Sequence, residues 1–126
     1  MVVVIFEFEI DPVGRERYLE LATILREEVE KIEGFVSVKR FENIHEPGFF
    51  VSISTWEDME AAREWKEHVE HSSAQQEAKS TGIFKDYRIR VAEVIRDYSL
   101  EWACLVIIAL FSLEALDKEA LWAVSF

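Results

Sequence analysis

The residues whose types and spacing could do chemistry lie between Trp65 and Gln75. Histidines follow Trp65 at positions 68 and 71, and Gln75 comes one turn later. Residues spaced by three and four share one face of a helix. An imidazole can accept a proton near neutral pH, so either histidine could deprotonate a phenol while the indole holds the ring flat. The predicted site residues are catalytic His71 and His68, with Trp65 and Gln75 at the substrate.

Two other interpretations of these histidines stay open. Glu64, Glu67 and Glu70 lie among them, so both imidazoles could belong to the solvated side of an acidic helix. The pattern His-x-x-His with a preceding glutamate could also bind a metal ion. A metal site, however, needs a third ligand and a supporting shell that the sequence does not identify. We therefore predict no metal.

Hydrophobic periodicity predicts the elements that position these residues. Val2 to Ile10 places apolar side chains at its even positions and acidic ones between them near its end, which is typical of a half-buried strand. Asp11 and Pro12 form a helix-start signal, and apolar residues at steps of three and four follow as far as Gly34. This spacing predicts an amphipathic helix that the glycine closes.

The sequence after Gly34 predicts a β-hairpin, a second helix and a last strand. The helix begins near Asp58, with Thr55 as a capping-box partner, and breaks or bends around Ser72 and Ser73. The three strands span Phe35 to about Glu42, Phe49 to Trp56, and Phe84 to Val94. The resulting β-α-β-β-α-β order is that of a ferredoxin-like α+β fold, whose helices cover one face of the sheet.

The other face of such a sheet has no helix of its own protomer to cover it. The predicted strands are rich in Val, Ile and Phe on both faces, so a lone protomer would expose a large apolar patch to water. We therefore predict that the sheet packs on a second subunit to form a homodimer.

We divide the chain into a domain over residues 1–100 and an extension over residues 101–126. The extension is mostly apolar, and three of its charged residues share one side when it is drawn as a helix. We predict a helix that packs on its own subunit or on the partner. A membrane-associated tail and a poorly ordered segment are the alternatives, although an interfacial helix would carry basic residues on its polar face.

Composition excludes several classes of protein. The 126 residues carry a net charge of -11, which argues against nucleic acid and anionic membranes as partners, because phosphates are bound by clustered Lys and Arg. No apolar run approaches the roughly 20 residues that span a bilayer. A single cysteine, Cys104, rules out an internal disulfide framework and favours a cytoplasmic location.

Three stretches resemble the antibiotic biosynthesis monooxygenase (ABM) family. They are the strand Phe49 to Trp56 with the Glu-Asp-Met-Glu-Ala that follows it, the segment His71 to Gln75, and the strand Phe84 to Val94. The resemblance covers about residues 2–99. It implies a ferredoxin-like protomer whose sheet packs on that of a second copy in a dimeric α+β barrel, with a small-molecule pocket between sheet and helices in each subunit.

The same resemblance implies an activity. Family members include cofactor-independent monooxygenases that use molecular oxygen to oxidise polycyclic phenols to quinones. Their pockets are lined from strand ends and the second helix, which adds Trp56, Phe41 and Tyr87 to the predicted substrate-binding residues. We therefore expect a monooxygenase that acts on an aromatic or quinol-type small molecule. A non-catalytic small-molecule-binding or stress-response module of the same fold is the alternative.

Haem-degrading members form another branch of the family, and the resemblance to them is partial. That branch has an asparagine on the first strand, a tryptophan on the second helix and an iron-binding histidine ten residues after the tryptophan. Trp65 is present here, but Phe6 and Glu7 occupy the strand position and Gln75 stands in place of the histidine. We predict no cofactor and leave haem and flavin open.

Overall fold

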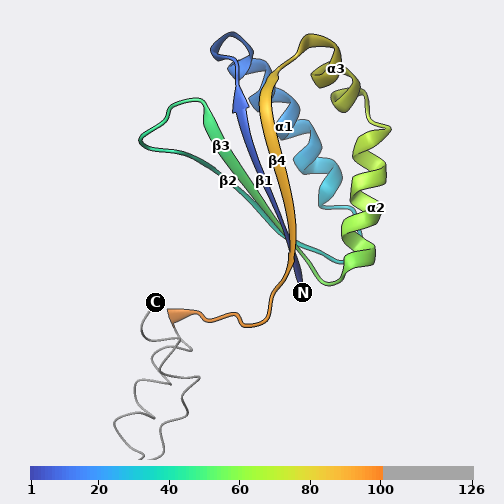
Figure 1. The fold of residues 1–126 in the computed structure, drawn as a ribbon. Helices are drawn as coiled ribbons and strands as arrows, with labels where there is room; N and C mark the ends of the chain where they lie inside the picture. Colours follow the sequence, from blue (N-terminus) through green and yellow to red (C-terminus); the bar gives the residue numbers. More distant parts are fainter. Residues whose placement is uncertain (101–126) are drawn as a thin grey trace, which may run out of the picture. The chain divides into compact units, whose positions relative to one another are not determined.

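The computed structural model describes residues 1–100 of the chain. Its elements are β1 (Val2–Ile10), the short 3-10 helix η1 (Pro12–Gly14), α1 (Arg15–Val29), β2 (Phe35–Glu42), β3 (Phe49–Trp56), α2 (Met59–Glu70), α3 (Ser73–Thr81) and β4 (Phe84–Glu93). The predicted ferredoxin-like α+β order is confirmed, with the second helix in two pieces (Figure 1).

The chain divides into two compact units. Met1–Val94 form the first, which holds all four strands and the helices between them, and the second begins at Ile95. The predicted helical extension over residues 101–126 lies outside the described residues. Within the described part, no helix is long and apolar enough to cross a membrane.

The four strands form one antiparallel sheet in the order β2-β3-β1-β4. The register places Phe8 of β1 opposite Phe50 of β3 and Tyr87 of β4. Residues directly opposite each other in adjacent strands point to the same face, so the register assigns every strand residue to one of two faces. All three α-helices lie on one side of the sheet (Figure 1); we call that side the covered face and the other side the open face.

The covered face carries the core. As the sequence predicts, the even-numbered residues of β1 point toward the helices, and Val2, Phe8 and Ile10 are buried. Two groups of buried side chains result: Phe8, Ile10, Tyr18, Leu21, Ala22, Phe50, Ala74 and Ile83 in one, and Val2, Val29, Trp56, Ala61 and Ala62 in the other. The core therefore joins the sheet to α1, α2 and α3.

Local signals set the helix boundaries, with two differences from the prediction. Asp58 caps α2 itself, because its carboxylate accepts the Ala61 N–H at 2.8 Å; Thr55 belongs to β3, so the predicted capping box is wrong. Helix α1 ends at Val29 instead of at Gly34. Gly34 has φ +88° and packs so closely that an added Cβ would lie 2.7 Å from that of Ala61, so this turn into β2 requires glycine.

The predicted break after α2 is confirmed, and it changes the position of Gln75. The Ser72 hydroxyl accepts the Gln75 N–H at 3.2 Å and caps a new helix, α3. Gln75 therefore lies in the first turn of α3 and does not continue the helix face that bears His68 and His71, contrary to the predicted spacing argument.

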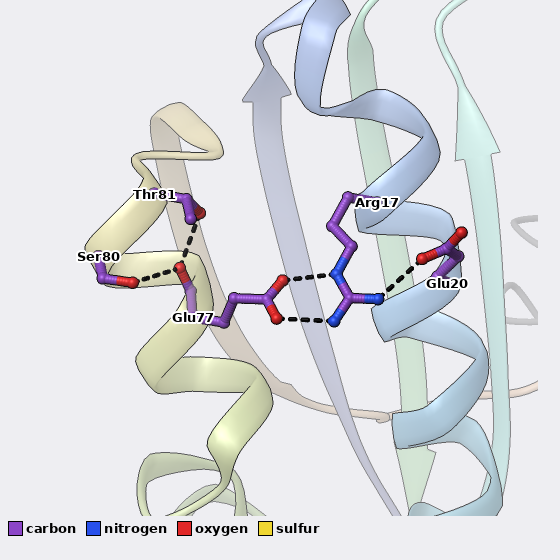
Figure 2. A network of polar contacts seen from close by, with 5 residues as sticks. All are labelled: Arg17, Glu20, Glu77, Ser80 and Thr81. Carbon is purple, nitrogen blue, oxygen red and sulfur yellow. Dashed lines mark hydrogen bonds and ion pairs between the residues drawn. The ribbon is translucent and has the colours of Figure 1, made fainter.

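Helix α3 is fastened to α1 by a polar network (Figure 2). Arg17 of α1 donates two hydrogen bonds of 2.7 Å to the Glu77 carboxylate and one of 2.8 Å to Glu20. Hydrogen bonds from Arg17 lower the pKa of Glu77 below its ordinary value. The hydroxyls of Ser80 and Thr81 donate to the Glu77 carbonyl. These contacts hold α3 beside α1 and thereby place its first turn.

Candidate functional site

Three of the predicted site residues form a stacked row on the helix side of the sheet. The Trp56 and Trp65 rings stack with centroids 6.4 Å apart and planes at 29°. Trp65 and His68 stack at 5.5 Å and 18°. The row runs from the core, where Trp56 has no exposed surface, to the surface of α2, so the indoles hold the His68 imidazole flat at one side.

Glu28 of α1 holds the edge of the His68 imidazole ring through a hydrogen bond. Its Oε2 lies 2.9 Å from His68 Nε2, which joins α1 to α2 across 40 residues of sequence. A carboxylate only accepts hydrogen bonds, so Nε2 carries a hydrogen and donates it. In the neutral imidazole, Nδ1 is then the free proton acceptor. The pair therefore has the orienting arrangement of a general base.

His71 has the opposite tautomer. It caps the C-terminus of α2, and its Nδ1 lies 2.8 Å from the Glu67 carbonyl oxygen. A carbonyl also only accepts, so Nδ1 carries the hydrogen and Nε2 is the acceptor. The two histidines together offer two proton acceptors from adjacent turns of α2.

Both histidines line a surface hollow of about 340 Å³ where α1, α2 and the start of α3 meet. Its walls are Ile24, Glu28, Glu67, His68, His71, Ser72, Ser73 and Ala74; we call it the helix hollow. The hollow is open to solvent, its volume lies at the low end of the range for small-molecule sites, and its walls combine apolar, acidic, imidazole and hydroxyl groups. Among residues 1–100, no three His, Cys, Asp or Glu side chains are placed to hold a metal ion.

The structure does not bring the other predicted residues to this hollow. Trp56 is a core residue whose Nε1 donates to Ser54 Oγ at 2.9 Å. Phe41 is on the open face, opposite Val51 and half exposed. Tyr87 is on the covered face, 62% exposed on the edge strand β4, with its ring 6.0 Å from that of Phe6. Gln75 is half-buried in α3, and neither Gln75 nor Trp65 is part of the wall.

Sequence reasoning missed Glu28 and Ile24. The two residues are spaced by four, so they lie on one side of α1. Ile24 is an exposed apolar residue, and this exposure is the one local sign that this side of α1 lines a hollow. Nothing local pairs Glu28 with His68, because the pairing depends on how α1 and α2 pack together.

A four-stranded antiparallel sheet with helices on one face defines a ferredoxin-like protein, and the histidine-lined hollow between those helices is its candidate site. The sequence model of the antibiotic biosynthesis monooxygenase family matches residues 1–77. The chain belongs to this family, and the resemblance noted from its sequence is confirmed.

Individual relatives agree with the family. "Jasmonate monooxygenase ABM" of Pyricularia oryzae is 34% identical over 94 residues, which are 75% of this chain and 43% of that protein. The chain thus spans less than half the length of that relative. Among solved structures, Rv0793 from Mycobacterium tuberculosis has a TM-score of 0.64 at 17% identity, and the match covers 78% of this chain and 98% of that one.

A cofactor-independent oxygenase, SnoaB from Streptomyces nogalater, has the same fold. The structure of a mutant of that oxygenase superposes with a TM-score of 0.62 at 12% identity, and the match covers 76% of this chain and 94% of that one. At this identity the likeness concerns the fold alone.

Proposed function

We propose that this protein is a cofactor-independent monooxygenase that oxidises an aromatic or quinol-type small molecule in the helix hollow. The observation that carries the proposal is the setting of His68: Glu28 orients its imidazole, Trp65 stacks on it, and Nδ1 is free to accept a proton. Family membership supports the same class of reaction, as do the names of the fungal relative and the Streptomyces oxygenase.

In the proposed reaction the substrate supplies the electrons. His68 Nδ1 takes a phenolic proton, Glu28 stabilises the imidazolium, and the negative charge spreads to a ring carbon. That carbon bonds to molecular oxygen, and the resulting peroxide loses water to leave a carbonyl. The substrate exchanges two hydrogen atoms for one oxygen atom and the second oxygen leaves as water, so no external reductant is required.

Trp65 stacks between Trp56 and His68 and is not part of the hollow wall, so we propose that it orients His68; its predicted contact with the substrate stays a prediction. Trp56 is enclosed behind it and acts as a positioning residue for the indole. His71 is a second proton acceptor at the same hollow. Gln75 and Tyr87 stay proposed substrate contacts from α3 and β4.

Homodimerisation through the open face is part of the proposal. Phe41 and Phe49 are exposed there, and Val51 and Ile53 are only half-buried. Burying such a surface stabilises association by the hydrophobic effect. We therefore place Phe41 at the dimer interface instead of at the substrate. We also propose a cytoplasmic location, which the single cysteine, Cys104, favours.

Haem fits the described residues poorly. Phe6, one of the two residues that could match the family's asparagine, packs its ring 4.7 Å from that of Phe8 and 5.5 Å from that of Phe84. Gln75, which stands in place of the family's iron-binding histidine, has no imidazole. The proposed reaction therefore uses no cofactor.

The test is oxygen uptake by the purified protein with quinols and polycyclic phenols, for wild type and variants. We expect His68→Ala to lower kcat about 100-fold or more, the usual contribution of a general base, and Glu28→Gln to lower it by less. His45→Ala is the matched control, because His45 is exposed in the β2–β3 loop and away from the hollow.

The outcomes separate the two candidate functions. Substrate-dependent oxygen uptake that the His68 variant loses and the His45 variant keeps supports the monooxygenase. A compound that raises the melting temperature without consuming oxygen identifies the non-catalytic binding module instead.

A further inference from the structure

The free polar atoms on the walls of the helix hollow are mainly hydrogen-bond acceptors. The His68–Glu28 contact leaves His68 Nδ1 as an acceptor, and the bond from His71 to the Glu67 carbonyl leaves His71 Nε2 as an acceptor. The carboxylate of Glu67 has no ion pair or hydrogen bond within residues 1–100. Glu67, His68 and His71 are all exposed, so three acceptors on one stretch of α2 face water and have no donor from the described part of the chain.

Donors on the same wall are fewer and weaker. The Ser72 hydroxyl donates to the Val69 carbonyl at 2.7 Å and accepts the Gln75 N–H. The Ser73 hydroxyl and the first amides of α3 remain, and a helix N-terminus corresponds to about half a positive charge. Within the described residues, no Lys or Arg lines the hollow. The one lysine of α2, Lys66, is paired with Glu70 at 3.5 Å.

The charges decide which ligands the hollow takes. Glu28 and Glu67 contribute two full negative charges to its wall, against the partial charge of the α3 N-terminus, and the whole chain has a net charge of -11. An anionic ligand would lose its hydration without gaining a cation in exchange. A ligand with O–H or N–H groups would satisfy the free acceptors.

We infer that the helix hollow selects neutral or cationic ligands that donate at least two hydrogen bonds, excludes carboxylates, and uses Glu67 as the residue that sets this selectivity. The inference rests on the proposed function for the location of the site and extends it to the substrate class. Di- and polyhydroxylated aromatics and aromatic amines belong to this class, whereas aromatic acids and ethers do not.

Binding of matched naphthalene probes under anaerobic conditions tests the inference. The probes are dihydroxynaphthalene, methoxynaphthalene, naphthylmethylamine and naphthoate, titrated into the full chain by calorimetry. We expect dihydroxynaphthalene to bind at least about fivefold more tightly than methoxynaphthalene, as one net hydrogen bond provides, and naphthoate to bind most weakly.

Variants assign the selectivity to Glu67. Glu67→Gln should strengthen naphthoate binding and weaken naphthylmethylamine binding, each roughly three- to fivefold, the range for a partly exposed charge pair. Glu60→Gln makes the same charge change on α2 away from the hollow and should alter neither. Naphthoate that binds as tightly as dihydroxynaphthalene, or a Glu67 variant that behaves like the Glu60 variant, overturns the inference.

The same experiment keeps the inference distinct from the proposed function. Binding is measured without oxygen, so it does not depend on catalysis. The preference for hydrogen-bond donors can therefore hold even if the protein is the non-catalytic binding module. Oxygen uptake without tighter binding of hydrogen-bond-donating probes would support the monooxygenase and contradict the inference.

Discussion

The two faces of one sheet carry apolar side chains of the same kinds but differ in what covers them. On the covered face, Trp56 has no exposed surface and Phe8 is buried between α1 and the strands. On the open face, Phe41 is 50% exposed although it lies on the strand next to β3. The contrast shows that alternation assigns a side chain to a face, while only the packing of helices or a partner decides whether that face is closed.

The covered face itself is closed unevenly. Its helices shield β1 and β3 at the centre of the sheet, whereas Tyr87, Ile89 and Val91 of β4 point to the same side and remain exposed. On the open face of β4, Arg90 instead pairs with Glu7 of β1 at 3.0 Å. The edge strand therefore keeps apolar and charged surface that the centre of the sheet does not.

The largest effect on stability should come from a substitution on the covered face. Replacing Trp56 by alanine removes a fully enclosed indole and the stack that supports Trp65, so we expect the free energy of unfolding to fall by about 3–5 kcal/mol. Urea denaturation followed by circular dichroism measures it. Val13→Ala, at an exposed position of η1, should change stability by less than about 0.5 kcal/mol. Equal losses in the two variants would contradict the contrast.

A second variant tests how closely α2 packs against the turn before β2. Gly34→Ala adds a Cβ next to that of Ala61 at a positive φ, so we expect a loss of about 2 kcal/mol from backbone strain and the clash together. Thermal unfolding measures it. Gly82→Ala is the control: its φ is +63°, but no atom of the described residues lies within 4 Å of an added Cβ, so the loss should be smaller. A larger loss at Gly82 would refute close packing at Gly34.

On the open face, the effect on the protomer should be small and the effect on assembly large. Phe41→Glu places a charge on the proposed dimer interface, so we expect monomers in size-exclusion chromatography with light scattering, while the fold is retained. Ile44→Glu, at an exposed position of the β2–β3 loop, should leave the dimer intact. If Phe41→Glu stays dimeric, the subunits associate elsewhere.

The smallest effect should appear at the surface link between α1 and α3. The pKa of Glu77 lies below its usual 4.5 in the folded protein because Arg17 donates to its carboxylate. A lowered folded pKa contributes stability above the unfolded pKa, and that contribution is lost as the pH falls through the folded pKa.

Acid titration measures this link. The protection factors of the α3 amides, which are exchange rates corrected for the intrinsic pH dependence, should therefore fall below about pH 4.5 in wild type, and Glu77→Gln should remove much of this change. Glu16→Gln makes the same change at an exposed position of α1 and should preserve it. Identical pH profiles for wild type and Glu77→Gln would show that the link does not hold α3.

Much of the fold could be predicted from local sequence patterns. The bounds of β1, β2 and β3 agree with the strands read from alternation and turn residues, and the break near Ser72 agrees with its serine pair. Such features depend on neighbours within a few residues, which the sequence displays directly. The capping of α2 by Asp58 instead of Thr55 shows the limit, because two acceptors a turn apart can both fit the same local signal.

The candidate site was predictable only in part. His68, His71 and Trp65 could be singled out because they lie within two turns of one helix. Glu28 could not, because its contact with His68 depends on the packing of α1 against α2, and no local pattern encodes that geometry.

The sequence by itself determined the strands, the helix stripes, the acidic balance and the histidines on α2, since each is a property of residue types at short spacing. Only the tertiary structure decided that Trp56 is core and Phe41 is open surface, that Gln75 leaves the histidine face, and that Glu28 meets His68. Those outcomes depend on contacts between residues far apart in the chain, and such contacts form only when the helices pack on the sheet.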